Sequence, residues 1–475
     1  MVSGPARALA AVLVVAVPWL GTTPAAASPA PPVTRLGDTQ LDPTGLYFVS
    51  YNGLVNGTSY QQHGLITHGG FQYAAWYTGS RHAMVARREL PTGAWETVRL
   101  PHQLSTNDSH NSISLGVSPT DGRLHVAMDT HNNPIFYVKS ERNLVSNPAR
   151  VSWSAARFGA LQHTLDGVDL GSITYPRFAA APSGELLFSY RTGVSGNGWS
   201  ELAEYDGTWH KLGKWSSASG AYTFHRATSN TRNMYLHGLT YEPGGRLHAA
   251  FTWREGNPAV LCHRGGVTNH DTGYVYSDDR GRTWHNGSGT RVATTGSGTL
   301  VGIRSPGLVV DPLDVDHGLM NDESQTVDST GNPHVIISYV PGRFTGCVTD
   351  FARQRRSHGR ALHLYRDAQR RWHKRELPVP LNAYGRSQIV LDAADNAYVV
   401  MPYGRIVAAS KATGWTDWTL RFDGAGLDAH GEVVVDRTRT ADGVLSVLYQ
   451  RRSTGTTPSP VRVADFRLGL IDSRH

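Results

Sequence analysis

The sequence has little helical character and few charged side chains. Only 17% of its 475 residues are charged, and no long segment repeats apolar residues with the period of a helix. Glycine and aromatic residues are abundant instead, with 51 Gly, 20 Tyr and 12 Trp. We therefore expect no helix-rich domain, and the composition favours β structure.

Long apolar runs are missing after the N-terminal region. The run from Ala8 to Leu20 is too short for a confident membrane span. It is followed by a small-x-small pattern ending at Ala27, which is typical of a signal-peptide cleavage site. We predict a signal peptide over residues 1–27, a flexible N-terminal arm over residues 28–40, and an exported, extracellular protein.

Blocks of Lys and Arg are also missing, although the chain is basic. Its net charge is +7, and the basic residues are scattered singly. A positive charge that is spread along the chain suits an acidic partner. Export argues against nucleic acid as that partner. We expect a monomer that binds an anionic polysaccharide, with neither nucleic acid nor a membrane as partner.

One local pattern recurs seven times along the chain. A short alternating strand leads into a polar turn, and a strongly apolar strand leaves it. Each gap between copies has room for a second hairpin. Four strands per unit, repeated radially, are typical of a propeller. We predict an all-β fold, a seven-bladed β-propeller of four-stranded antiparallel blades, as a single catalytic domain over residues 41–475. The turns fall at Gly70, Gly122, Gly184, Gly245, Gly331, Asn396 and Gly443.

An Asp box, S-x-D-x-G-x-T-W, occupies Ser277–Trp284. Such a turn closes the outer hairpin of a propeller blade, so it supports the fold and says little about function. We expect Asp279 to bind turn amides and Trp284 to pack between sheets.

Reactive side chains recur at one predicted rim of the propeller. The start of each blade's first strand and the end of its second strand should lie at the same mouth of the channel. Three blades offer the pairs His110 and His131, Tyr175 and Arg191, and His237 and Arg254. The other blades offer His63, Tyr77, Tyr384, Arg386, Tyr403, Arg405, His430 and Arg451.

Carboxylates are nearly absent from this set. One His or one Tyr–Arg pair at a strand end is more often structural, but convergence of many on one rim favours an anion site. The set suits β-elimination on a uronate: Arg neutralises the carboxylate, while His and Tyr can act as base and acid. Hydrolytic glycosidases usually need two carboxylates instead. No catalytic cofactor is required.

Short motifs around these residues resemble a known group. Ser109-His110-Asn111, Thr174-Tyr175-Pro176-Arg177-Phe178 and Ser189-Tyr190-Arg191 are similar to motifs of the Asp-box propeller lyases. These include ulvan lyases and lyases that cut rhamnosyl-glucuronic acid linkages. The resemblance implies a seven-bladed propeller that cleaves a rhamnose-rich uronate polysaccharide by elimination.

The same resemblance implies roles for individual residues. His110 and Tyr175 share the base and acid roles, Arg191 neutralises the carboxylate, and His131 supports the site. Which of His110 and Tyr175 takes the proton stays open, as does the choice between ulvan and a rhamnosyl-glucuronate of plant gum or arabinogalactan. We expect substrate-binding roles for His131, Tyr190, His237 and Arg254.

The two cysteines allow two interpretations. Cys262 and Cys347 lie in loops of neighbouring predicted blades, and an exported protein favours a disulfide. The same loops hold His270 and His358, and two Cys with two His can form a tetrahedral structural zinc site. The resembled lyases include members with structural zinc, so both interpretations stay open.

Two other functions compete with elimination. A hydrolase of the sialidase or rhamnosidase kind is one; a sialidase would add a Tyr–Glu pair and an acid Asp, which the predicted rim does not offer convincingly. A non-catalytic glycan-binding propeller is the other, and it would need no reactive group at all.

Overall fold

The computed structural model describes residues 1–2, 4, 29–60 and 63–469 of the chain. Apart from three positions, the predicted signal peptide over residues 1–27 lies outside the described residues and stays a prediction. Within the described part of the chain, no helix is both long and apolar enough to cross a membrane.

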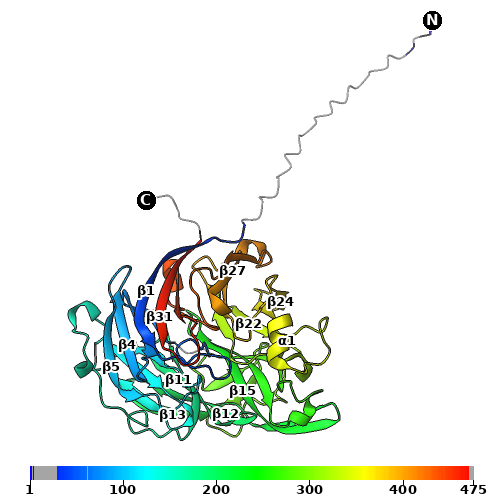
Figure 1. The fold of residues 1–475 in the computed structure, drawn as a ribbon. Coiled ribbons are helices and arrows are strands. Elements are labelled where there is room, and N and C mark those ends of the chain that lie inside the picture. The colour runs from blue at the N-terminus through cyan, green and yellow to red at the C-terminus, as the bar shows by residue number, and fades with distance from the viewer. Residues whose placement is uncertain (3, 5–28, 61–62, 470–475) are drawn as a thin grey trace.

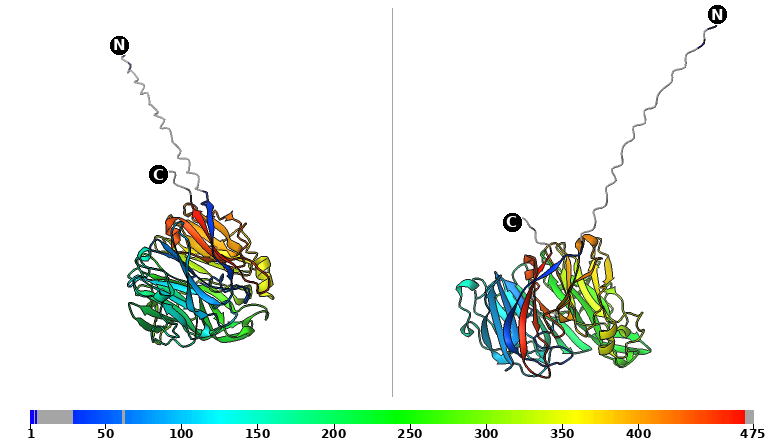
Figure 2. Two further views of the ribbon diagram at one scale, coloured as in Figure 1. Left: turned by 60° about the vertical axis from the view of Figure 1, so that its left-hand side comes forward. Right: turned by 45° about the horizontal axis from the view of Figure 1, so that its top comes forward.

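The described strands form seven antiparallel sheets arranged around a common centre (Figures 1 and 2). We call these sheets blades 1 to 7 in chain order. The first strands of neighbouring blades contact one another, which makes them the innermost strands. The prediction of an all-β, seven-bladed propeller is therefore confirmed.

Blades 1 to 3 come from the first half of the chain. Blade 1 contains β2 (Leu65–His68), β3 (Phe71–Tyr77), β4 (His82–Glu89) and β5 (Glu96–Gln103). Blade 2 contains β6 (Ser114–Ser118), β7 (Arg123–Met128) and β9 (Phe136–Lys139). Blade 3 contains β10 (Ile173–Ala180), β11 (Leu186–Val194), β12 (Asn197–Tyr205) and β13 (Trp209–Lys214), with β8 (His131–Asn133) on the free edge of β10.

Blade 4 is the largest sheet. It contains β14 (Ser219–Phe224), β15 (Ala227–Tyr241), β16 (Leu247–Glu255), β17 (Asn269–Ser277), β18 (Thr283–His285), β19 (Arg291–Thr294) and β20 (Val309–Asp311). Blade 5 contains β21 (Ser324–Val327), β22 (Pro333–Tyr339), β23 (Arg360–Arg366) and β24 (Trp372–Glu376). Blade 6 contains β25 (Gln388–Leu391), β26 (Ala397–Met401), β27 (Arg405–Ala409) and β28 (Thr419–Phe422).

Blade 7 joins the two ends of the described chain. Its order is β29 (Val434–Val435), β30 (Val444–Gln450), β31 (Ser459–Leu468) and β1 (Val33–Gly45). The predicted flexible arm over residues 28–40 is therefore wrong from Val33 onward. The sequence of this segment suggests a loose arm because the segment forms an outermost strand, which exposes many side chains. It is held by its backbone ladder to β31, and that ladder requires no apolar pattern.

Helical structure is confined to short pieces of the described chain. The α-helix α1 (Phe351–His358) lies in the loop before β23. The 3₁₀ turns are Pro148–Arg150, Ala155–Arg157, Pro258–Val260, Val315–His317, Pro402–Gly404, Lys411–Thr413 and Arg439–Asp442.

The repeated turns lie where the sequence pattern predicts them. Gly184, for example, connects β10 to β11 with a φ of 112°, a conformation that favours glycine. The blades are not uniformly four-stranded, however. Blade 2 has three strands, because the segment at its outer edge, residues 158–162, pairs with β9 and Ser140 only through isolated bridges, and blade 4 has additional strands.

The Asp box forms the predicted turn between β17 and β18. The Asp279 carboxylate accepts hydrogen bonds from the backbone N–H of Arg282 at 3.1 Å and of Thr283 at 2.7 Å. Trp284 is fully buried and stacks on Trp215, with ring centroids 4.2 Å apart. The motif therefore stabilises blade 4 and has a structural role, with no part in the predicted reactive rim.

Candidate functional site

A pocket of about 370 Å³ opens at the mouth of the propeller where the first strands begin and the second strands end. It brings together seven of the predicted rim residues. Among its described lining residues there is no Asp or Glu. The lining comprises Tyr51, Tyr60, His110, His131, Asn132, Tyr175, Arg191, Val194, Ser195, Tyr235, Arg254, Val267, Met320, Asn321, Phe351, Tyr384 and Arg386.

Two stacked imidazoles form one wall of the pocket. The rings of His110 and His131 lie 4.2 Å apart at an interplanar angle of 23°. Their Nδ1 atoms contact the two oxygens of Asp108, at 2.7 Å for His110 and 2.6 Å for His131. If each Nδ1–H donates to the carboxylate, each Nε2 keeps its lone pair free to accept a proton.

The protonation states of this triad follow from burial and hydrogen bonding. Burial lowers the pKa of His110 below its usual value, against the opposing effect of Asp108. Burial disfavours the charged form of Asp108, but the hydrogen bonds from His110 and His131 outweigh it and lower the pKa of that carboxyl. At neutral pH the triad therefore holds one carboxylate and an uncharged His110.

The short strand β8 places His131 beside Tyr175. Thr174 pairs with His131 across β10 and β8, and the Asn132 N–H donates to Thr174 Oγ1 at 2.8 Å. Tyr175 follows at a register irregularity of β10 and has a φ of 57°. This positive φ is strained for a tyrosine, and such strain is concentrated at functional sites.

Tyr175 is enclosed by aromatic rings and a cation. Its ring lies 5.9 Å from His110 and 5.6 Å from Tyr60, and the Arg191 guanidinium carbon is 5.3 Å away. Burial raises the pKa of Tyr175 well above its usual value, and the charge of Arg191 only partly offsets this. The hydroxyl therefore keeps its proton at neutral pH.

Arg191 is 95% buried, and it has few partners. Its Nη2 donates to Thr174 Oγ1 at 3.1 Å and its Nη1 to the Tyr235 hydroxyl at 3.3 Å. Its Nε has no hydrogen-bond acceptor among the described residues. A buried guanidinium without a carboxylate partner is suited to bind an external anion.

Tyr235 lies between two arginines. The guanidinium carbons of Arg191 and Arg254 are 5.9 and 5.2 Å from its ring centre, and its hydroxyl donates to Ser195 Oγ at 3.1 Å. Burial alone would raise its pKa, but the charges of Arg254 and Arg191 lower it below the usual value. Arg254 therefore lies at the site as predicted, with Tyr235 as its neighbour.

Two of the predicted substrate-binding residues do not reach the pocket. Tyr190 precedes Arg191 on β11, so its side chain faces the other way, and its buried hydroxyl donates to Glu201 at 3.3 Å. His237 is completely buried deeper along β15, where its Nδ1 accepts the Glu323 N–H at 3.2 Å. Neither residue lines this pocket: strand alternation turns Tyr190 away from it, and His237 lies too deep along the channel.

The other members of the predicted rim are divided between this pocket and other places. Tyr384 and Arg386 line the pocket, and the Arg386 guanidinium carbon is 4.4 Å from the Tyr60 ring centre. His63 lines a different pocket at the opposite mouth. The residues outside the lining of the candidate site are Tyr77, Tyr403, Arg405, His430 and Arg451.

The predicted zinc quartet does not form. Cys262 and Cys347 are joined in a disulfide, and disulfide sulfurs are not the thiolates that bind zinc. His270 instead contacts Glu255 and Asp271, both at 3.0 Å, while His358 stacks on Phe344. The structure thus has the disulfide of the two interpretations, and the four residues do not gather around one point in it.

Three tyrosines of the pocket were missed by the sequence pattern. Tyr51 and Tyr60 lie between β1 and the first repeat, a region that the repeat-based prediction does not cover. Tyr235 precedes the predicted His237 by two residues on β15. The alternation of that strand could have pointed to Tyr235, since residues two apart share a face.

A ring of seven antiparallel sheets with these Asp-box and hairpin features defines a β-propeller. The BNR repeat-containing family matches residues 71–379, and the chain belongs to that family. It is also distantly similar to ulvan lyases. It is 25% identical over 452 residues to the long isoform of Pseudoalteromonas sp. (strain PLSV), covering 84% of this chain and 42% of that protein. The short isoform of Alteromonas sp. (strain LOR) is 26% identical over 256 residues, 44% of this chain and 46% of that protein.

Solved structures of similar fold include two polysaccharide lyases. The crystal structure of the polysaccharide lyase Uly1 has a TM-score of 0.68 at 17% identity, covering 91% of this chain and 99% of that one. An ulvan lyase bound to -[GlcA(1-4)Rha3S]- has a TM-score of 0.59 at 11% identity, covering 90% and 95%. The chain spans less than half the length of the long ulvan lyase that it matches.

Proposed function

We propose that this chain is a polysaccharide lyase that cleaves a uronate-containing polysaccharide by β-elimination. The observation that carries the proposal is the composition of the pocket. Arginines line the pocket together with an uncharged His110 and a protonated Tyr175, and no carboxylate is among the described lining residues. Elimination needs a cation, a base and an acid, whereas most glycoside hydrolysis needs two carboxylates.

The proposed reaction begins with binding of the uronate carboxylate by Arg191, with Arg254 nearby. The Nε2 atom of His110 then takes the C5 proton, and the electron pair of the C5–H bond forms the C4–C5 double bond. The C4–O4 bond breaks, and the Tyr175 hydroxyl gives its proton to the leaving oxygen. Proton transfer from His110 to Tyr175 through solvent restores both groups.

The directions of the two pKa shifts favour this assignment over its reverse. Burial keeps His110 unprotonated at neutral pH and keeps Tyr175 protonated. A base must begin the cycle without its proton and an acid must begin with it. Arg191 contributes by stabilising the second negative charge that develops on the uronate carboxylate as the proton leaves.

A rhamnose–uronate polysaccharide is the substrate we propose. The distant similarity to ulvan lyases supports this, as does the fold shared with an ulvan lyase bound to -[GlcA(1-4)Rha3S]-. We also propose that the protein acts outside the cell as a monomer. The disulfide between Cys262 and Cys347 supports export, because disulfides persist in oxidising compartments.

The deciding experiment is incubation of the purified protein with ulvan and, separately, with gum arabic. Elimination makes an unsaturated uronate that absorbs in the ultraviolet, and we expect this absorbance to rise with one of the two. New reducing ends without that absorbance would identify a hydrolase. Binding without cleavage of either polysaccharide would identify a glycan-binding propeller, and both results would contradict the proposal.

A further inference from the structure

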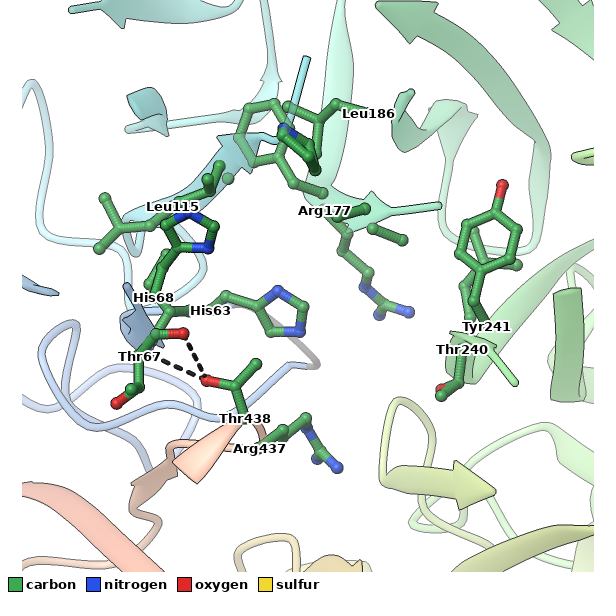
Figure 3. Close-up of a pocket in the computed structure, with 18 of the residues that line it drawn as sticks. His63, Thr67, His68, Leu115, Arg177, Leu186, Thr240, Tyr241, Arg437 and Thr438 are labelled. Carbon is green, nitrogen blue, oxygen red and sulfur yellow. Dashed lines mark hydrogen bonds between the residues drawn. The ribbon is translucent and has the colours of Figure 1, made fainter. Parts of the chain in front are cut away.

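A second pocket, also of about 370 Å³, lies at the opposite mouth of the propeller. It is lined by the ends of the first strands, as at His68 of β2, Ala180 of β10 and Tyr241 of β15. The candidate active site lies at the beginnings of those strands. Figure 3 shows the side chains of His63, Arg177 and Arg437 extending into the space between the labelled walls.

Arg437 is a cation without an anion at this mouth. Its guanidinium donates only to uncharged groups: the backbone oxygens of Gln325 and Ile389 at 3.3 and 2.9 Å, Ser324 Oγ at 2.8 Å, and Gln388 Oε1 at 2.5 Å. Among the described residues no carboxylate oxygen lies within ion-pair distance of it. Leaving a desolvated cation unpaired is costly, so an anion that binds there relieves the cost.

Arg177 adds a second positive charge beside the same pocket. Its Nη2 pairs with Asp322 at 2.6 Å, but its Nε has no acceptor among the described residues. Burial, followed by the charge of Arg177, lowers the pKa of Arg437 to about 10, so both guanidiniums are charged at neutral pH. Two cations therefore face the pocket, and only Arg177 is paired with a carboxylate, which leaves a net positive charge.

His63 lies between these cations, and their charges affect its pKa. Burial, then the charges of Arg437 and Arg177, lower the pKa of His63 to about 4. The ring is therefore uncharged at neutral pH, and no described residue shares a hydrogen bond with it. An uncharged imidazole can donate one hydrogen bond to an anion without adding a further unpaired charge.

The rest of the pocket wall is largely apolar. Leu115 and Val117 of β6, Phe178 of β10, Leu186 of β11 and Leu239 of β15 line it. Apolar walls with a few convergent polar groups are typical of a small-molecule site. They favour a ligand with an apolar body over a fully hydrated sugar or an inorganic anion.

We propose that this mouth of the channel binds a small organic carboxylate, with its charge between Arg437, Arg177 and His63 and its apolar body against the walls formed by β6 and β10. The site is separate from the candidate active site and takes a different chemical class of ligand. Its occupancy does not depend on whether the opposite mouth performs elimination.

The test is calorimetric titration of the protein with benzoate, in the absence of any polysaccharide. Benzyl alcohol has a similar apolar body without the charge, and sulfate has charge without the apolar body. We expect benzoate to bind about tenfold or more tightly than either, since a hydrogen bond to a charged group is worth more than a factor of ten. Equal binding of the alcohol, preferential binding of sulfate, or no binding of benzoate would each overturn the proposal.

Variants of the protein test whether benzoate binds in this pocket. Arg437→Gln should weaken benzoate binding about tenfold or more, while Arg375→Gln on the exposed face of β24 should leave it unchanged. Because loss of Arg437 removes several buried hydrogen bonds, Thr240→Trp provides an independent variant that fills the pocket from the end of β15. If folded protein with Thr240→Trp binds benzoate as the parent does, this pocket is not the site.

Discussion

The imidazole of His110 stacks on that of His131 at 4.2 Å, with both rings tethered by Nδ1 to Asp108. This relationship fixes which nitrogen of each ring faces the pocket. One carboxylate below the pocket surface thus orients two groups at the surface. In the proposed reaction Asp108 is a positioning residue, because it acts on the substrate only through His110.

Replacing Asp108 with Asn tests that positioning role. The amide cannot accept from both rings as the carboxylate does, so His110 loses its fixed tautomer. We expect turnover to fall by a factor on the order of 10²–10⁴. Because the hydrogen bond that His110 makes to Asp108 raises the pKa of His110, its loss should move the acid limb of the pH–rate profile to lower pH. Asp206→Asn, in an exposed turn, is the control and should change neither. Normal turnover with an unmoved profile in Asp108→Asn would contradict the role.

Replacing Tyr175 with Phe removes the proposed acid while keeping its ring. We expect turnover to fall by a factor on the order of 10²–10⁴, with little change in thermal unfolding. Tyr190→Phe is a matched control, since this tyrosine is also buried in blade 3 but its hydroxyl faces Glu201. Near-normal elimination by Tyr175→Phe would mean that another group protonates the leaving oxygen, and Tyr235 would be the next candidate.

Replacing Arg191 with Ala removes the positive charge that stabilises the developing enolate. We expect a loss in turnover on the order of 10²–10³, expressed in kcat more than in KM because the stabilised charge develops only in the transition state. Arg375→Gln on the outer strand serves as the control for loss of one positive charge. An effect confined to KM would show that Arg191 binds substrate without stabilising the transition state.

Buried histidines make the fold sensitive to acid. Burial, followed by the charges of Arg177 and Arg386, lowers the pKa of His237 to about 3, below its value in the unfolded chain. The unfolded state therefore takes up a proton first as pH falls. The stability is fully present above about pH 6.5 and is lost progressively toward pH 3, by an amount on the order of a few kcal/mol. Urea denaturation at pH 7 and pH 5 measures this loss.

His237→Gln should reduce the difference in unfolding free energy between the two pH values. His263→Gln, at an exposed position, should leave it unchanged. The same pH sensitivity in His237→Gln and in the parent protein would assign the acid loss to other groups, His125 first among them, since burial also lowers its pKa to about 3.

Much of the fold was predictable because the propeller repeats. Each turn such as Gly184 lies between an alternating strand and an apolar strand. Because this pattern occurs seven times, an error in assigning one copy does not change the predicted fold. The strand β1 was not predictable by this route. Only its pairing with β31 gives Val33–Gly45 a structure, and that pairing joins the two ends of the ring.

The candidate site was predictable where strand ends carry the side chains. His110, Tyr175 and Arg191 follow from their positions at the beginnings and ends of strands. The rule does not place His237 correctly relative to the pocket, because it does not say how deep along the channel a residue lies, and two residues along a strand correspond to about 6–7 Å. Tyr60 lies in a loop outside the repeats, so only the folded chain brings it against His110, with ring centroids 4.9 Å apart.

The pairing of β1 with β31 also constrains when the molecule can be completed. Thr39 Oγ1 donates to the Val463 carbonyl oxygen across 424 positions of sequence. As the chain emerges from a ribosome or a translocation pore, β1 appears before β31 and has no partner until β31 has emerged. Contacts of such long range form late and slowly. Until then neither edge of β1 has a partner, and an unpaired edge is open to pairing with other chains, so the emergence of β31 is also the step that covers one edge of β1.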